Sequence, residues 1–513
     1  MTLVDMLRPY QAEAAERIAS AGAMLLADQP GLGKTFTSLG SLYLADRLRP
    51  GTATLIAAPL ITCDTAWLPT IQSYMPEVCV VDAFSGSRAA RSKRVEENRC
   101  DDKHMIIVTN HDSLGISKSL DEFVPAIHAM AYSALFIDES HMVLPMDYDS
   151  PADATQFWRG LFKLSDDCPD ALRLAISGTP DRGKLHYRFG TWRFLYPQFF
   201  GRAVQSYQDW LRANFYTYDI TVPVSRRDGS RFDATVQKIG HMLNAPRWHF
   251  YDAQSVVRRT KSEVATELPA KRYLDIDVPH PQALAKAYME YRDEFMTNDD
   301  GSKGNALVYS LRAQQFASCE YHVVDRDGQD VTVPKPGGVS AKRDWLIEWL
   351  SARNLGVNPS EPPTGQVVVS SQFSQVLYWL KAELADAGFE CEVIDGSLPQ
   401  HRRSALQRSF QAGDFRIALL SSGLGVGIDL DAADDLIFFD VPRSPDVQEQ
   451  VEDRIHRISR VHQVTIWRLR SRGTIDVLIS ATNDATFHST RALLDGVRAV
   501  EFDRNIVHRL EER

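Results

Sequence analysis

The sequence predicts an α/β protein built from two parallel-sheet lobes in tandem, with helical and hairpin insertions. Short apolar runs alternate with helical stretches over residues 1–180 and again from about residue 340. This alternation is typical of parallel sheets whose strands are joined by right-handed crossovers. The length of 513 residues and the hydrophobic content of 44% are sufficient for two or three globular domains.

Composition narrows the class of protein. No apolar run reaches the length of a membrane span, and the N-terminal residues lack the features of a signal peptide, so no membrane partner is expected. The six cysteines are scattered without a Cys-x-x-Cys pair, which favours reduced thiols in the cytoplasm over a zinc site. The net charge of −10 weighs mildly against a nucleic-acid partner. It does not exclude one, because a local basic groove is sufficient.

The most informative stretch is a glycine-rich turn between an apolar run over 24–27 and a predicted helix. Strand, glycine-rich turn, Gly-Lys-Thr and helix form the pattern of a phosphate-binding loop. Gly31 and Gly33 would let backbone N–H groups face a phosphate. Lys34 would reach the β- and γ-phosphates of ATP, and the Thr35 hydroxyl would hold Mg²⁺.

Two residues near this loop need separate interpretation. Asp28 stands where the motif has its first glycine, and a chance Gly-Lys-Thr in a surface turn is the alternative explanation for the loop. Gln11, in a predicted helix that ends at Ser20, has a donor and acceptors that suit the adenine edge of ATP. A merely solvated glutamine is the alternative there.

Four more strands complete the predicted first sheet, at 54–60, 105–111, 134–141 and 172–180. The third carries Asp138 and Glu139 near its end, at the carboxyl edge where ligands bind in open α/β sheets. Asp138 would hold Mg²⁺, and Glu139 would orient and help deprotonate the attacking water. Helix capping is the alternative role for such carboxylates.

Residues 185–275 break the alternation. An aromatic stretch over 192–200 favours core packing, and 221–232 predicts a hairpin with an Asp-Gly turn and arginines near its tip. A second hairpin is predicted over 321–333, followed by a linker at 335–338.

The second α/β repeat has predicted strands near 367–370, 392–396, 417–421 and 436–440, but no second phosphate loop. This favours one ATP in the cleft between the lobes. We therefore expect the division of the chain to be lobe 1 over 1–275, with an insertion at about 185–257, and lobe 2 over 276–513, with an insertion at about 280–340, motifs over 366–460 and a C-terminal tail.

The ordered motifs resemble those of superfamily 2 helicases: Gln11, Gly31–Thr35, Asp138-Glu139-Ser140-His141 and Ser177-Gly178-Thr179-Pro180. Three further stretches, 258–271, 368–402 and 450–458, are similar to the Swi/Snf family of DNA translocases. The resemblance covers nearly the whole chain, and the ordered set is far more specific than any one piece.

The resemblance implies two RecA-like lobes and an ATP-dependent translocase or remodeller of double-stranded DNA, that is, a DNA-dependent ATPase that uses ATP and Mg²⁺. It implies that Gln450 contacts ATP and that Arg454 and Arg457 are arginine fingers, on one face if their segment is helical. It also implies DNA contacts at Thr109, Ser177, Arg258, Lys261, Ser370 and Ser421. Such phosphate contacts position a protein without reading sequence.

Several positions differ from the motifs of the Swi/Snf family, so the chain resembles a divergent member of that family. The family's Gln-Asn pair after Gly-Thr-Pro is Asp181-Arg182 here, and the Asn of its Gly-x-Asn-Leu segment is Asp429. Its Trp-Asn-Pro is Arg443-Ser444-Pro445, and its terminal Gly-Gln is Ser459-Arg460. The absence of appended modules resembles the minimal bacterial and viral members, which predicts the cytoplasm of a bacterium or an infected cell.

Two other functions stay open on the sequence. One is a strand-separating DNA or RNA helicase. The other is an ATP-gated clamp that binds ATP without productive translocation. The clamp is disfavoured because Lys34, Asp138, Glu139, Arg454 and Arg457 are all intact.

Overall fold

The computed structural model contains two compact units, and it confirms the predicted α/β class. The first unit comprises residues 1–220 and 236–266, and the second comprises 221–235 and the chain from 267 onward. The residues that the structure describes are 3–115, 124–144, 155–180, 185–197, 206–225, 231–243, 245–264, 267–298, 303–326, 329–356, 365–424, 428–457, 460 and 462–494.

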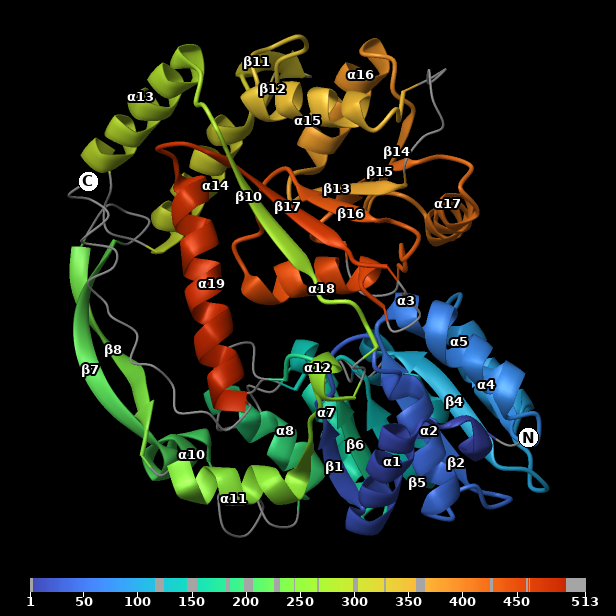
Figure 1. Ribbon diagram of the computed structural model, residues 1–513. Coiled ribbons are helices and arrows are strands. Elements are labelled where there is room, and N and C mark those ends of the chain that lie inside the picture. The colour runs from blue at the N-terminus through green and yellow to red at the C-terminus, as the bar shows by residue number, and fades with distance from the viewer. Residues whose placement is uncertain are drawn as a thin grey trace. The chain divides into compact units, whose positions relative to one another are not determined.

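A seven-stranded parallel sheet is the framework of the first unit, in the order β3-β4-β2-β5-β6-β1-β9 (Figure 1). Several strands are buried along their whole length, as expected when helices cover both faces of a parallel sheet. The strands are β1 (Ala23–Leu26), β2 (Ala53–Ala58), β3 (Cys79–Asp82), β4 (Met105–Asn110), β5 (Tyr132–Ile137), β6 (Leu172–Ile176) and β9 (Val256–Val257).

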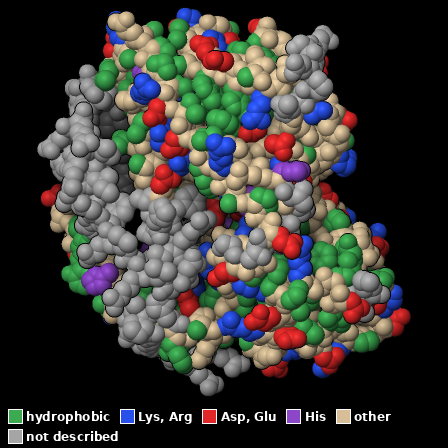
Figure 2. Space-filling model, viewed as in Figure 1, with side chains coloured by type: hydrophobic (Ala, Val, Ile, Leu, Met, Phe, Trp, Pro, Cys, Tyr) green, Lys and Arg blue, Asp and Glu red, His purple; other side chains and the backbone are tan. Residues whose placement is uncertain are grey.

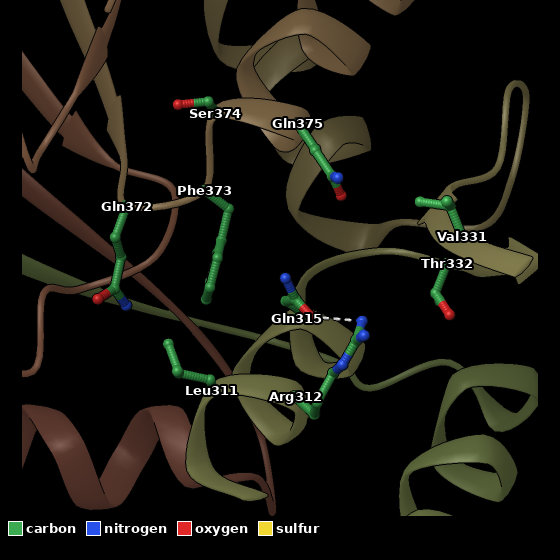
Figure 3. A pocket seen from close by; sticks show the side chains of 9 residues that line it. All are labelled: Leu311, Arg312, Gln315, Val331, Thr332, Gln372, Phe373, Ser374 and Gln375. Carbon is green, nitrogen blue, oxygen red and sulfur yellow. Dashed lines mark hydrogen bonds between the residues drawn. The ribbon is translucent and has the colours of Figure 1, made fainter. Parts of the chain in front are cut away.

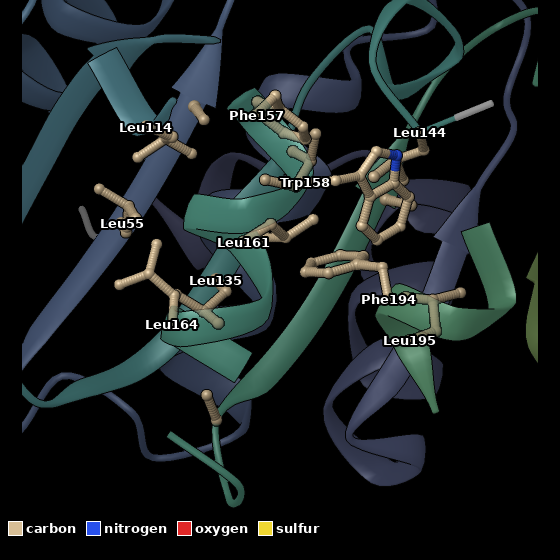
Figure 4. Packing of buried hydrophobic residues seen from close by; sticks show 14 of the residues in the cluster. Leu55, Leu114, Leu135, Leu144, Phe157, Trp158, Leu161, Leu164, Phe194 and Leu195 are labelled. Atoms are coloured by element: carbon tan, nitrogen blue, oxygen red, sulfur yellow. The ribbon is translucent and has the colours of Figure 1, made fainter. Parts of the chain in front are cut away.

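Helices of this unit bury apolar faces against the sheet. On α7, Phe157, Trp158, Leu161 and Leu164 recur at helical spacing and pack in the cluster that contains Leu55 of β2 (Figure 4). The described helices are α1 (Pro9–Ala21), α2 (Lys34–Leu44), α3 (Leu60–Thr62), α4 (Leu68–Tyr74), α5 (Arg88–Glu97), α6 (Pro125–His128), α7 (Gln156–Asp167), α8 (Arg188–Leu195), α10 (Tyr207–Asn214), α11 (Ala245–Ser255) and α12 (Lys261–Val264).

The insertion of the first unit has an aromatic core. Trp192 and Phe194 of α8 are buried. The centroid of the Trp192 ring lies 5.2 Å from the ring centroids of both Trp210 and Trp248. Core packing was predicted for this stretch, although its 198–200 end lies outside the described residues. β7 (Phe215–Ser225) and β8 (Arg231–Met242) pair as the predicted hairpin, whose tip at 226–230 is likewise outside them.

The second unit contains a six-stranded parallel sheet in the order β10-β17-β16-β13-β15-β14. Its strands are β10 (Arg272–Val278), β13 (Val367–Ser371), β14 (Cys391–Ile394), β15 (Ile417–Ser421), β16 (Asp435–Phe438) and β17 (Thr465–Ser471). Its helices are α13 (Gln282–Asn298), α14 (Lys303–Ser318), α15 (Ala341–Ala352), α16 (Ser374–Asp386), α17 (Gln400–Ala412), α18 (Pro445–Ile455) and α19 (Ile475–Leu494).

Two features concern the expected division of the chain. The expected boundary at residue 275 falls within β10, which pairs with β17 along its full length. The hairpin expected in the second insertion is present as β11 (Tyr321–Arg326) and β12 (Gln329–Pro334), which are antiparallel. Its turn at 327–328 lies outside the described residues.

The surface carries charges of both signs. On the face in Figure 2, Lys and Arg side chains are interspersed with Asp and Glu, without a large patch of one sign in the described part of the chain. None of the described helices combines the length and apolar character that a membrane span needs.

Candidate ATPase site

The glycine-rich loop follows β1 and ends where α2 begins at Lys34. Gly31 and Gly33 have φ angles of 84° and 77°, in the left-handed region that favours glycine. The Lys34 ammonium donates a hydrogen bond of 3.0 Å to the carbonyl oxygen of Asp28. The loop therefore has the backbone form of a phosphate-binding turn, with its lysine lying across it.

Gln11 is built into the wall of this loop. Its Nε2 donates to the carbonyl oxygen of Leu32 at 3.0 Å, and its Oε1 accepts from the backbone N–H of Arg8 at 2.9 Å. A Cβ added at Gly33 would lie 2.4 Å from Nε2 of Gln11. A larger residue at position 33 would therefore have to displace the Gln11 amide from this position, and the adenine contact of Gln11 stays a prediction.

Asp28 has a partner that sequence reasoning missed. Its carboxylate is fully buried, and Oδ1 accepts hydrogen bonds of 3.0 Å from both the backbone N–H and Nε of Arg259. Nη2 of Arg259 pairs with Oδ2 of Asp28, and Nη1 donates to the carbonyl oxygen of Tyr10. Arg259 thus joins the loop to α1 and to the chain after β9. Asp28, which replaces the first glycine of the motif, is therefore a structural residue that holds the loop in place.

We expect Arg259→Ala to lower the free energy of unfolding by about 3 kcal/mol, because it leaves a buried carboxylate without its cation. Denaturant unfolding followed by tryptophan fluorescence measures the change. Arg49→Ala is the matched control, since the pair of Arg49 with Asp46 is exposed and is expected to contribute less than about 1 kcal/mol. Equal stability of the two variants would contradict the anchoring role.

The paired carboxylates follow β5 at the carboxyl edge of the sheet. Asp138 is buried, and its Oδ2 accepts a 2.8 Å hydrogen bond from Nε1 of Trp67. Burial and the charge of Glu139 raise the pKa of Asp138 to about 6. The positive charge of Lys34 acts in the opposite direction on this pKa.

The backbone conformation of Glu139 and a contact with His141 both orient the Glu139 side chain. Its φ angle is 44°, which is uncommon for a residue other than glycine. Nδ1 of His141 lies 3.2 Å from Oε2 of Glu139 and 2.9 Å from Oγ of Ser177. Burial alone would raise the pKa of Glu139, but the hydrogen bond from His141 and the charge of Lys34 lower it. Glu139 is therefore a carboxylate held in its ionised, proton-accepting form.

The residues proposed for DNA contact in the first unit are mostly engaged internally. Thr109 is fully buried, and its hydroxyl donates to the carbonyl oxygen of Ala83 at 3.0 Å. Ser177 is fully buried beside His141. Arg258 donates to the carbonyl oxygen of Ala27 at 3.0 Å, and Lys261 is also buried. The side chains of Thr109, Ser177 and Arg258 thus contact other groups of the first unit. A DNA role for all four residues stays a prediction.

The two predicted fingers lie in the second unit. α18 ends at Ile455, so Arg457 lies beyond the helix and does not share a helical face with Arg454. Arg454 is buried and donates to the carbonyl oxygen of Leu424; burial and the charge of Arg457 lower the pKa of Arg454 to about 10.

Arg457 forms an ion pair with Asp429, and its side chain is 30% exposed. Asp429 stands where the resembling family has Asn, so this departure gives the second predicted finger an anionic partner. Gln450, predicted to contact ATP, lies half-buried on α18.

The other proposed DNA contacts of the second unit differ in access. Ser370 is fully buried, and its hydroxyl lies 2.8 Å from that of Ser422. Ser421 lines a cavity of about 560 Å³ together with Arg403, Asp395 and Ser397. Of the two serines, only Ser421 is therefore presented to a ligand-sized space.

A phosphate-binding loop beside an acidic pair at the carboxyl edge of a parallel sheet defines the P-loop nucleotide-binding class. The SNF2-related domain model matches residues 10–320, and the helicase conserved C-terminal domain model matches residues 341–463. The first match covers more than half of the chain, so the chain belongs to the SNF2-related family, as its motifs predicted.

Two curated relatives of this chain are longer proteins from eukaryotes. A Danio rerio chromodomain-helicase-DNA-binding protein 1-like is 26% identical over 92% of this chain and 42% of its own length. The Saccharomyces cerevisiae ISWI chromatin-remodeling complex ATPase ISW1 is 25% identical over 92% of this chain and 39% of its own length. The chain thus spans less than half of either relative.

A solved Sulfolobus solfataricus SWI2/SNF2 ATPase core in complex with dsDNA aligns over 96% of this chain and 97% of that chain, with 20% identity and a TM-score of 0.39.

Proposed function

We propose that the chain is an ATP-dependent translocase or remodeller of double-stranded DNA, and that it hydrolyses ATP with the groups of the P-loop site. The observation that carries the proposal is the placement of Lys34, at the start of α2 after β1, and of Asp138 and Glu139, directly after β5, at the carboxyl edge of one parallel sheet. Membership of the SNF2-related family supports it.

The residues present fit ATP with Mg²⁺. Thr35 and Asp138 offer a hydroxyl and a carboxylate, the all-oxygen set that Mg²⁺ takes when phosphates and water complete its coordination. The described residues contain no group of three or more His, Cys, Asp or Glu that could hold a metal unaided, consistent with an ion that arrives with the nucleotide. Bound there, Mg²⁺ would neutralise phosphate charge.

Protein side chains and backbone groups carry out the other steps of hydrolysis. Lys34 and the loop N–H groups hold the phosphates, and Glu139 accepts a proton from the attacking water. Phosphoryl transfer depends mainly on such positioning and charge stabilisation. Arg454 and Arg457 would stabilise the charge that develops in the transition state of the nucleotide held by the first unit.

Double-stranded DNA is the proposed partner. One relative is named as a DNA-binding protein and another as a chromatin-remodeling ATPase, and both resemble this chain across 92% of its length. In the second unit, the cavity with Arg403 and Ser421 offers a cation and a hydroxyl, groups that suit a backbone phosphate.

We expect duplex DNA to stimulate ATP hydrolysis more than single-stranded DNA or RNA, and binding to weaken steeply with salt because the proposed contacts are to phosphates. An ATPase assay with the three polymers at several salt concentrations measures this. Displacement of a triplex strand from a blunt duplex, without separation of a tailed duplex, is the expected translocation result.

Stimulation best by single strands, with efficient separation of the tailed duplex, would instead identify a helicase. ATP-dependent DNA binding without turnover would identify a clamp.

A further inference from the structure

A second cavity of about 560 Å³ lies in the second unit and shares Ser374 and Gln375 with the cavity that contains Ser421. Three elements line it: α14, β12 of the hairpin, and the turn from β13 into α16 (Figure 3). The side chains that matter here are Arg312, Gln315, Thr332, Gln372, Phe373 and Gln375. Its volume is within the range of sites that bind small ligands, roughly 300–1,000 Å³.

Buried contacts fix one wall of this cavity. Nε2 of Gln372 donates to Oε1 of the fully buried Gln314 at 2.6 Å, and the backbone N–H of Gln372 donates to Oδ1 of Asp440 at 2.9 Å. Gln314 in turn donates to the carbonyl oxygen of Val441 at 2.8 Å. The turn that carries Gln372 and Phe373 is therefore held in place before any ligand binds, which reduces the entropy cost of binding.

The opposite wall brings a cation and further polar groups. Nη1 of Arg312 donates to Oε1 of Gln315 at 3.2 Å across one turn of α14, and this pair faces Gln375 and Thr332 in the close-up view (Figure 3). The residues that line the cavity include one cation and no carboxylate. The cavity thus favours neutral polar or anionic ligands, and it lacks the oxygen ligands that a divalent cation requires.

The chemistry of these groups matches a nucleobase attached to a phosphate. The exposed Gln375 amide presents a donor and an acceptor, as base edges do. The half-buried ring of Phe373 offers a face on which a base can stack. Arg312 suits the adjoining phosphate. A paired base inside a duplex cannot present its edge and its face to such a space, whereas an unpaired base can.

We propose that this cavity captures a single unpaired nucleobase of the bound DNA. The protein then prefers duplexes that contain an extrahelical nucleotide to perfect duplexes. The inference rests on the proposed function, because it takes DNA as the partner. It adds a structural preference that phosphate contacts alone do not provide.

The test compares binding of the full chain to three labelled duplexes by fluorescence anisotropy: a perfect duplex, one with a single extrahelical adenine, and one with an extrahelical abasic site. We expect about tenfold tighter binding to the adenine bulge than to the other two, the size expected from stacking of one base. Gln315→Ala and Phe373→Leu, which alter residues that line this cavity and not the cavity with Ser421, should abolish this preference and leave affinity for the perfect duplex unchanged.

Two controls accompany the test. Gln72→Ala removes an exposed glutamine from α4 and should keep the preference. Gln315 lies on a different element, α14, so its replacement keeps the test valid if Phe373→Leu is unstable by thermal unfolding.

Equal affinity for the three duplexes, with duplex-stimulated ATPase intact, would overturn the inference and leave the proposed function standing. Equal affinities combined with competition by free deoxyadenosine monophosphate would also overturn it, by assigning the cavity to free nucleotides. Failure to bind any of the duplexes would overturn both proposals.

Discussion

Glutamine in place of Glu139 should leave ATP affinity within about threefold of the wild-type value and lower kcat by about 10²–10⁴-fold, the usual contribution of a general base. The amide matches the carboxylate in shape but cannot accept a proton. The Asp138 carboxylate and the Lys34 ammonium, which hold the nucleotide in the proposed mechanism, remain. The effect should therefore fall on turnover and spare binding.

Single-turnover hydrolysis and binding of a fluorescent ATP analogue separate these two effects. Glu97→Gln, which alters an exposed carboxylate on α5, is the matched control and should be neutral. Lys34→Ala should lose turnover as well, but with weakened nucleotide binding, because the lysine contacts the phosphates in the ground state. Normal turnover in Glu139→Gln would mean that another group activates the water.

The loop and the acidic pair could be predicted from sequence because their chemistry is local. Five consecutive residues, Gly31 to Thr35, carry the loop, and one buried strand delivers Asp138 and Glu139 at its end. In a parallel sheet all strands present their carboxyl ends at one edge. The alternation of strands and helices was therefore enough to bring both motifs to that edge.

Contacts between distant segments could not be predicted in the same way. Arg259 was recognised only as part of a family-like stretch, yet it pairs with Asp28, which is 231 positions away in the chain. One signal was present: a carboxylate in a loop that follows a buried strand needs a cation if it is itself buried. The two-residue strand β9, which brings Arg259 to the loop, is too short to leave a periodic pattern.

Hydroxyl residues at strand ends were the weakest predictions for a related reason. A threonine or serine at the end of a strand can face outward to a phosphate or inward to a neighbouring carbonyl. Thr109 and Ser370 are both fully buried, with hydroxyls beside Ala83 and Ser422 respectively. Side-chain direction at these positions depends on the neighbouring strand, which the local sequence does not specify.

The largest effect is expected at Arg457. Alanine in its place should lower kcat by about 10³–10⁵-fold with little change in ATP affinity, since an arginine finger acts mainly on charge that develops in the transition state. Arg454→Ala should act in the same direction, but that side chain is buried against the carbonyl oxygen of Leu424. Part of its effect should therefore appear as lost stability, which makes Arg457 the clearer test.

Asp429 supplies the companion variant. Its ion pair with Arg457 neutralises the guanidinium and holds it within the second unit. Asp429→Asn, which restores the residue type of the resembling family, should free this side chain and raise the DNA-independent rate of hydrolysis. Arg470→Ala removes another ion-paired arginine, the partner of Asp275 and Asp277 on β10, and should leave kcat unchanged.

Steady-state ATPase assays and nucleotide titrations of these four variants test this assignment. If Arg457→Ala weakened ATP binding at an unchanged maximal rate, Arg457 would be a ground-state contact. The ion pair between Arg457 and Asp429 would then be structural. A residue that contacts only bound ATP would not need Asp429 to hold it in place before the reaction begins.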